Sequence, residues 1–278
     1  MSRIIFGTCS WKYPSWKGLV YSSDLKPMEY LQEYAQHYSM VEVDQWFWSL
    51  GESSFALPEE EVVTTYNNQT PESFRFTIKC PNALTLPFTP KQHINTSFLD
   101  ANVYSQFLAS LEPIHNKIGL LMLQFGYLNK QMIENQKAFE VRLSTFFDAI
   151  DSSFPLGIEM RNPKWINGQW FEFLSLHNIA PVFIQGYWLD DIVQTIRRYE
   201  HLLPQTISIR LHGEDRKGIE QEAQNRWDTL IWPKNRELAQ VAQLLTHLSE
   251  SGRTVYVQVN NHYEGSAPQT IQRIQQLM

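Results

Sequence analysis

Eight strand-like runs that alternate with helical patterns are the feature that most restricts how this chain can fold. Strands separated by helices run parallel to one another and are joined by right-handed crossovers. For eight such units in 278 residues, the closed solution is an α/β fold, a (β/α)8 TIM-like barrel. An open doubly wound sheet is the alternative. The runs are Ile4–Cys9, Met40–Asp44, Phe74–Cys80, Ile118–Phe125, Leu156–Arg161, Pro181–Gln185, Thr206–His212 and Thr254–Asn260.

The segments between these runs carry helical periodicity. Pro27–Tyr38 places a proline in its first turn and spaces its apolar residues along one face. No repeat or linker divides the chain, so we predict one barrel domain over residues 1–278. Two long connections, Pro81–Ser97 and Ile219–Lys234, are predicted to be elaborated loops after strands. The remaining predicted helices are Pro58–Asn68, Phe98–Leu111, Gln131–Ile150, Gln169–His177, Asp190–Leu203, Asn235–Ser249 and Pro268–Met278.

Composition excludes several classes of protein. A chain that is 43% hydrophobic can fill a large core, which argues against disorder. Its net charge of −6 argues against non-specific binding to nucleic acid or an anionic membrane, although a local basic pocket stays open. No signal peptide or membrane-spanning window is present, so a cytoplasmic protein is expected. Cys9 and Cys80 form neither a metal-type cluster nor a disulfide framework, and Cys9 reads as a small buried apolar residue.

Several predicted strands have one apolar and one polar edge. In Gly157–Asn162, Ile158 and Met160 alternate with Glu159 and Arg161, which is the period of a strand. The outer side of a barrel strand lies under helices, so the polar members should point inward, near the C-terminal ends where barrel enzymes have their sites. The inward set is predicted to be Glu42, Asp44, Lys79, Gln124, Glu159, Arg161, Gln185, Arg210, His212, Gln258 and Asn260.

Seven sequence blocks are distributed in order along the chain. They are Gly7–Tyr13 with Trp16–Gly18, Val41–Val43, Pro71–Phe76 with Lys79, Leu123–Phe125, Glu159–Trp165, Arg210–Gly213, and Asn260–Asn261 with Ala267–Pro268. Together these blocks resemble the DUF72 (YecE-like) family. This resemblance implies a TIM-barrel-like fold and a bacterial or archaeal cytoplasmic protein, and it implies no established activity.

The first functional hypothesis is an enzyme, of hydrolase or isomerase type, that binds a small anionic molecule, phosphorylated or sugar-like. Arg161 and Arg210 would grip a carboxylate or phosphate as a fork, and Lys79 would add a third cation. Acid–base chemistry would come from Glu42, Glu159 and His212. Ligand orientation would come from Gln124, Asn260 and Asn261, and stacking from Trp11 and Tyr13.

Three other interpretations stay open. Glu42, Asp44, Glu159 and His212 offer the donor atoms of a divalent-metal site, which would suit a phosphoester hydrolase, including one that acts on nucleic acid. No H-E-x-x-H spacing supports that site, so we assign no metal ligands, and the sequence identifies no cofactor. The barrel could instead bind a metabolite without converting it. Finally, the inward charges could be consumed by ion pairs with one another.

Overall fold

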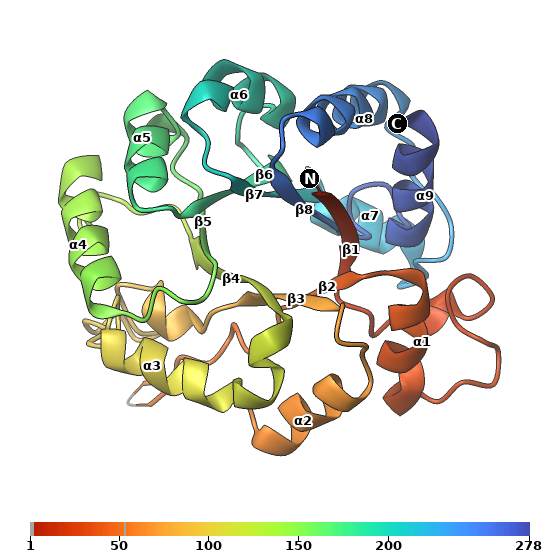
Figure 1. Cartoon of the computed structure of the whole chain (residues 1–278), viewed down its shortest axis with the longest axis horizontal. Coiled ribbons are helices and arrows are strands. Elements are labelled where there is room, and N and C mark those ends of the chain that lie inside the picture. Colours follow the sequence, from red (N-terminus) through yellow and green to blue (C-terminus); the bar gives the residue numbers. More distant parts are fainter. Residues whose placement is uncertain (1–2, 53) are drawn as a thin grey trace.

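The computed structural model describes residues 3–52 and 54–278, and these residues form a closed barrel (Figure 1). All neighbouring strands are parallel, and the first strand pairs with the last. The predicted fold is therefore confirmed. The strands are β1 (Arg3–Cys9), β2 (Met40–Val43), β3 (Arg75–Lys79), β4 (Ile118–Phe125), β5 (Leu156–Met160), β6 (Ala180–Gly186), β7 (Thr206–Gly213) and β8 (Thr254–Val259).

Except for α7 (Arg216–Ala223), the α-helices surround the barrel as an outer ring (Figure 1). Side-chain caps precede the five helices from α3 to α7. Asn135, for example, accepts a hydrogen bond from the N–H of Ala138, so helix α4 begins at Gln136 rather than at Gln131. No helix of the described residues is both long and apolar enough to cross a bilayer. The helices are α1 (Tyr30–His37), α2 (Glu60–Asn68), α3 (Ala101–Ser110), α4 (Gln136–Ala149), α5 (Gly168–Leu176), α6 (Ile192–Tyr199), α7 (Arg216–Ala223), α8 (Asn235–Glu250) and α9 (Ala267–Leu277). Short 3-10 turns occupy Pro14–Trp16, Pro27–Glu29, Asn82–Leu84, Glu112–Lys117, Pro163–Trp165 and Glu200–Leu202.

Helix α7 corrects the prediction for the connection after β7. Part of the segment expected to be a loop, Ile219–Lys234, lies in this helix. The Asp215 side chain accepts a hydrogen bond from the N–H of Gly218 and so caps the N-terminus. Ile219 and Ala223, four residues apart, are buried on one face, which gives the short helix its packing surface.

The barrel interior toward the N-terminal ends of the strands is a packed apolar layer and not a pore. Its side chains come from strands on all sides and exclude water beneath the C-terminal end. The charged inward-facing residues therefore meet above this layer, while Ser208, level with Val182 and Tyr256, donates a 2.8 Å hydrogen bond to Oε1 of Gln258. The layer consists of Ile5, Met40, Leu120, Met122, Ala180, Val182 and Tyr256.

The prediction that the Gln185 side chain points into the barrel is wrong. Val182 pairs with Ser208 and belongs to the interior layer, so the alternation along β6 turns Gln185 outward, where its Oε1 accepts a hydrogen bond from the N–H of Ile192. Strand β6 is apolar on both faces before Gln185. Its sequence therefore lacks the alternation of polar and apolar residues that would show which side chains point into the barrel.

Candidate functional site

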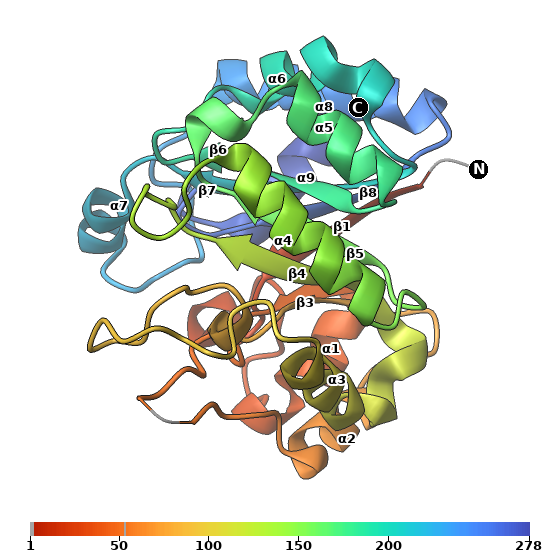
Figure 2. The ribbon, with the colours of Figure 1, turned by 90° about the vertical axis from the view of Figure 1, so that its left-hand side faces the viewer.

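A cavity of about 320 Å³ opens at the C-terminal end of the barrel. Figure 2 shows α7 and the loops after β2 and β3 projecting from this end. Parallel strands bring their C-terminal ends to one rim, which is why residues far apart in sequence meet there. The predicted site residues that line the cavity are Tyr13, Lys79, Gln124, Arg161, His212 and Asn260.

Beneath the cavity lies a layer of fully buried charge centred on Arg210. Its Nε and Nη2 each donate a 2.7 Å hydrogen bond to Glu42, one to each carboxylate oxygen, and its Nη1 donates to Oε2 of Glu159. These three side chains have no exposed surface. The network therefore crosses the barrel from β2 through β7 to β5. It confirms, for these residues, the interpretation that inward charges pair with one another.

Two further cations connect this layer to the cavity. Arg161 Nε donates a 2.7 Å hydrogen bond to Oε1 of Glu159, and Lys79 Nζ lies 3.5 Å from Oε1 of Glu42. In the described part of the chain, neither Nη atom of Arg161 has a hydrogen-bond partner. Of the predicted arginine fork, only Arg161 reaches the cavity, because Arg210 is enclosed between the two glutamates.

The cations determine how the two buried glutamates titrate. Burial by itself raises the pKa of a carboxyl group, because a charge is poorly solvated in the barrel interior. At Glu42 the charges of Arg210 and Lys79 outweigh burial and lower the pKa. At Glu159 burial is outweighed by Arg210 and Arg161, and the pKa falls to about 2. Both side chains are therefore fixed as anions at neutral pH.

Tight contacts between three loop ends shape one wall of the cavity. Gly186 has a φ of 122°, and a Cβ there would lie 2.1 Å from the carbonyl oxygen of Gly213, so no larger residue fits. This approach places the next residue, Tyr187, with its ring over Arg161, 4.6 Å from the guanidinium carbon. The ring of His212 lies 6.2 Å from that of Tyr187. The tyrosine thus holds the Arg161 guanidinium plane in place.

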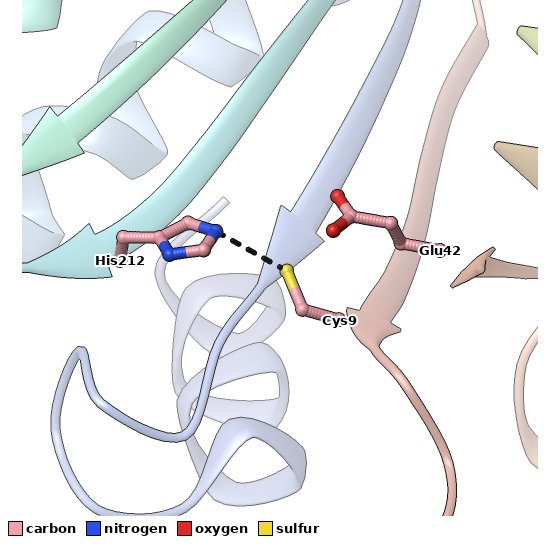
Figure 3. A group of neighbouring side chains, drawn as sticks. All are labelled: Cys9, Glu42 and His212. Carbon is pink, nitrogen blue, oxygen red and sulfur yellow. Dashed lines mark hydrogen bonds between the residues drawn. The ribbon is translucent and has the colours of Figure 1, made fainter. Parts of the chain in front are cut away.

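Cys9, Glu42 and His212 meet at the cavity floor (Figure 3). Cys9 Sγ lies 3.6 Å from His212 Nε2, and one ligand atom of each of the three residues lies within 4.8 Å of the others. Burial and the charge of Glu42 raise the pKa of the Cys9 thiol, while burial and the charge of Arg210 lower the pKa of His212. The thiol and the imidazole are therefore both neutral at pH 7.

This trio fits a divalent metal ion poorly. Both oxygens of Glu42 already accept hydrogen bonds from Arg210, and the thiol is held in its protonated form. A metal would also have to bind beside the positive charges of Arg210 and Lys79. Of the four ligands considered in the sequence hypothesis, Asp44 and Glu159 are not part of the trio.

The structure separates two predicted ligand-binding residues from the cavity. Trp11 is buried, and its ring packs edge-on against Tyr66 at 5.0 Å. Asn261 is also buried, and its Oδ1 accepts a 2.8 Å hydrogen bond from the N–H of Ala267, at the start of α9. Both support the fold around the rim, and neither lines the cavity.

Sequence reasoning missed several wall residues. Asp44, considered only as a metal ligand, borders the cavity, and burial together with the charge of Glu42 raises its pKa. The alternation of polar and apolar residues could not locate the other wall residues. Most of them lie in loops after the strands, where side chains do not follow the two-residue period of a strand. Cys9 could have been recognised as a wall residue, because it is the last residue of the first predicted strand and the polar residues of the other strands also lie at their ends. The residues missed as site residues are Cys9, Asp44, Phe47, Trp48, Tyr187, Gly213, Glu214, Arg216 and His262.

A comparison with protein families identifies the chain. A family model described as "Protein of unknown function DUF72" matches residues 5–278. The chain belongs to the DUF72 family. The UPF0759 protein YecE of Escherichia coli (strain K12) is 27% identical over 166 residues, which are 58% of this chain and 50% of YecE, so the match spans half the length of that relative. The UPF0759 protein YunF of Bacillus subtilis (strain 168) is 22% identical over 268 residues, which are 89% of this chain and 86% of YunF.

Solved structures of DUF72 proteins share the fold. A DUF72 family protein from Enterococcus faecalis has a TM-score of 0.72 at 20% identity, covering 99% of this chain and 95% of that one. A DUF72 family protein from Thermotoga maritima has a TM-score of 0.70 at 22% identity, covering 99% of this chain and 98% of that one. The barrel is thus the architecture of this DUF72 chain and of these relatives, and the family carries no assigned activity.

Proposed function

We propose that this barrel is an enzyme that binds a small anionic molecule, phosphorylated or sugar-like, in the cavity at its C-terminal end. The observation that carries the proposal is a pair of cations, Lys79 and Arg161, held at the cavity wall by the buried carboxylates of Glu42 and Glu159. Among the described residues, neither Nη atom of Arg161 has a hydrogen-bond partner, so the guanidinium can bind a ligand. Asp44, Glu214 and Arg216 also line the cavity, so its wall carries charges of both signs.

The geometry of Arg161 supports binding of an oxyanion at this floor. Its Nε is bonded to Glu159, and its plane is packed against Tyr187, so the guanidinium is held before a ligand arrives. Its two Nη groups can then donate to one anion. Gln124 and Asn260, which also line the cavity, offer amide donors to the same ligand.

Proton transfer in this proposal belongs to Asp44 and His212. Both line the cavity, whereas Glu42 and Glu159 lie beneath it with their oxygens occupied by cations. The neutral imidazole of His212 can accept a proton, and the carboxyl group of Asp44, whose pKa is raised by burial and by the charge of Glu42, lies on the same wall. Glu42 and Glu159 then act as positioning residues, which fix Lys79, Arg161 and Arg210.

Anion binding is tested with inorganic phosphate as the probe, at constant ionic strength. We expect phosphate to raise the Tm of the wild-type protein by about 5 °C at about 100 times Kd, since a ligand that binds only the folded state stabilises it by about 2.7 kcal/mol there. Lys79→Met and Arg161→Met should each remove most of this shift, because each deletes one of the two cations that Glu42 and Glu159 hold at the cavity wall. The measurement is a thermal denaturation series in phosphate, with sulfate and acetate in parallel.

The matched control is Arg236→Met, which removes an exposed cation from α8, outside the cavity. It should keep the full phosphate shift. Equal shifts in wild type, Lys79→Met and Arg161→Met, or no shift with any of the three anions, would contradict the proposal. Mass spectrometry of a co-purified ligand before and after incubation then separates an enzyme, which converts the ligand, from a barrel that only binds it.

A further inference from the structure

A second hollow adjoins the cavity at the C-terminal end of the barrel, which we call the cationic cavity after Lys79 and Arg161. The side chains that line the second hollow differ in chemistry from those of the cationic cavity. The second hollow measures about 320 Å³ and lies between the loops that follow β2 and β3. The side chain of Trp48 belongs to the walls of both hollows. None of the described residues that line the second hollow is charged, and its apolar walls are formed by Trp48, Leu50, Leu86, Pro87, Phe88 and Met132. We call this hollow the apolar groove.

Buried side chains hold the base of the apolar groove in place. Asn82 Oδ1 accepts hydrogen bonds from the N–H groups of Ser49 and Leu50, at 3.0 and 2.8 Å, which ties the loop after β2 to the loop after β3. Asn82 is itself buried, and both of these hydrogen bonds are partly buried. The groove is therefore formed before any ligand arrives.

The far wall is fixed in the same manner. Asn95 Nδ2 donates to the carbonyl oxygens of Ala83 and Leu86, at 2.7 and 2.6 Å. Phe88 and Ile94 pair across an antiparallel bridge, which closes this part of the loop into a hairpin. A long loop held by buried amides presents a defined surface, as expected of a binding loop.

Trp48 is the feature that links the two hollows. Its side chain is 81% exposed, although it is large and aromatic. Such exposure leaves the indole available to a ligand on the cavity side and on the groove side. A molecule whose charged part sits against Lys79 and Arg161 can pass over Trp48 and place an uncharged part in the groove.

We infer that the natural ligand is an amphiphilic anion, with a phosphate or carboxylate head in the cationic cavity and an aromatic or other apolar group in the apolar groove. This inference rests on the proposed function and narrows its substrate class. The size of the groove suits a small molecule, since ligand pockets begin at about 300 Å³. The division of charge between the hollows then gives the ligand its direction: head toward the barrel axis, apolar group toward the loops after β2 and β3.

The experiment compares anions that share a head and differ in the attached group. Inorganic phosphate, phenyl phosphate and 1-naphthyl phosphate are titrated by calorimetry, with acetate and 1-naphthoate as the carboxylate arm. We expect 1-naphthyl phosphate to bind about tenfold or more tightly than inorganic phosphate, because ring burial adds apolar contact area. Comparison of 1-naphthyl phosphate with 1-naphthoate shows which head the cavity prefers.

Trp48→Ala should remove this advantage, so that 1-naphthyl phosphate binds the variant no more tightly than inorganic phosphate does. The matched control is Trp188→Ala, which removes another exposed tryptophan from the same end of the barrel but from neither hollow, and it should preserve the advantage. If inorganic phosphate binds while all three phosphates have equal affinity, the apolar group has no site and this inference fails alone. If Trp48→Ala and Trp188→Ala behave alike, the groove is not the site. If no anion binds, the proposed function fails with it.

Discussion

Replacement of Arg210 by methionine is expected to lower the free energy of unfolding by about 3 kcal/mol, the lower end of the range for breaking a buried ion pair. Arg210 donates to both Glu42 and Glu159, and all three side chains are fully buried. The loss stays at the lower end because Lys79 and Arg161 still balance the two carboxylates. Urea denaturation at pH 7 measures it, and Arg236→Met on the surface of α8 should change stability little.

A double-mutant cycle separates the ion pair from a simple packing defect. Glu42→Gln alone should destabilise the protein, because it leaves two donors of Arg210 facing a neutral amide. Added to Arg210→Met, the same change should cost much less, since the carboxylate it removes has already lost its bidentate partner. The two effects should therefore fall short of additivity by about 1–3 kcal/mol. Strict additivity would show that Arg210 contributes only volume.

The second large effect is the loss of stability in acid. The pKa of Glu159 is about 2 in the folded protein, against 4.5 as its ordinary value. Between these values the unfolded chain binds the proton and the folded one does not, so stability falls as pH falls. The full contribution, about 3 kcal/mol, is present above pH 4.5 and disappears by about pH 2. The lowered pKa of Glu42 acts in the same direction.

Urea midpoints measured from pH 7 down to pH 2.5 test this expectation. Glu159→Gln should be less stable at pH 7 and should lose less stability than wild type below pH 4.5, because the group that titrates is gone. Glu250→Gln, which removes an exposed carboxylate from the end of α8, should follow the wild-type curve. Parallel curves for wild type and Glu159→Gln would contradict the assignment of acid sensitivity to this buried carboxylate.

Both predictions describe a floor that is rigid because its charges are paired. Arg210 is committed to Glu42 and Glu159, so it does not bind the ligand. It holds the carboxylates that in turn position Lys79 and Arg161. Such a floor supports preorganised anion binding, since the cations need not reorganise when a ligand arrives. The stability of the network and the proposed anion binding thus depend on the same side chains.

The sequence was sufficient for the fold and for the end of the barrel at which the inward charged residues meet. Alternation in β5 and β7 placed Glu159, Arg161 and Arg210 inward, and the structure brings them together. The same alternation gave the wrong direction for the Gln185 side chain in β6, because the residues before it are all apolar. It also failed at α7, where a helix of eight residues with two buried apolar positions has too weak a period to be recognised.

The sequence by itself determined which residue types reach the C-terminal end of the barrel, because the two-residue period of a strand is a local property. Only the tertiary structure decided which of those residues pair with one another and which of them face the cavity. Whether an inward arginine binds a ligand or two glutamates depends on distances across the barrel between β2, β5 and β7, and no local pattern encodes these. The same holds for Trp48, whose place between two hollows is set by how two loops pack and not by its neighbours in the chain.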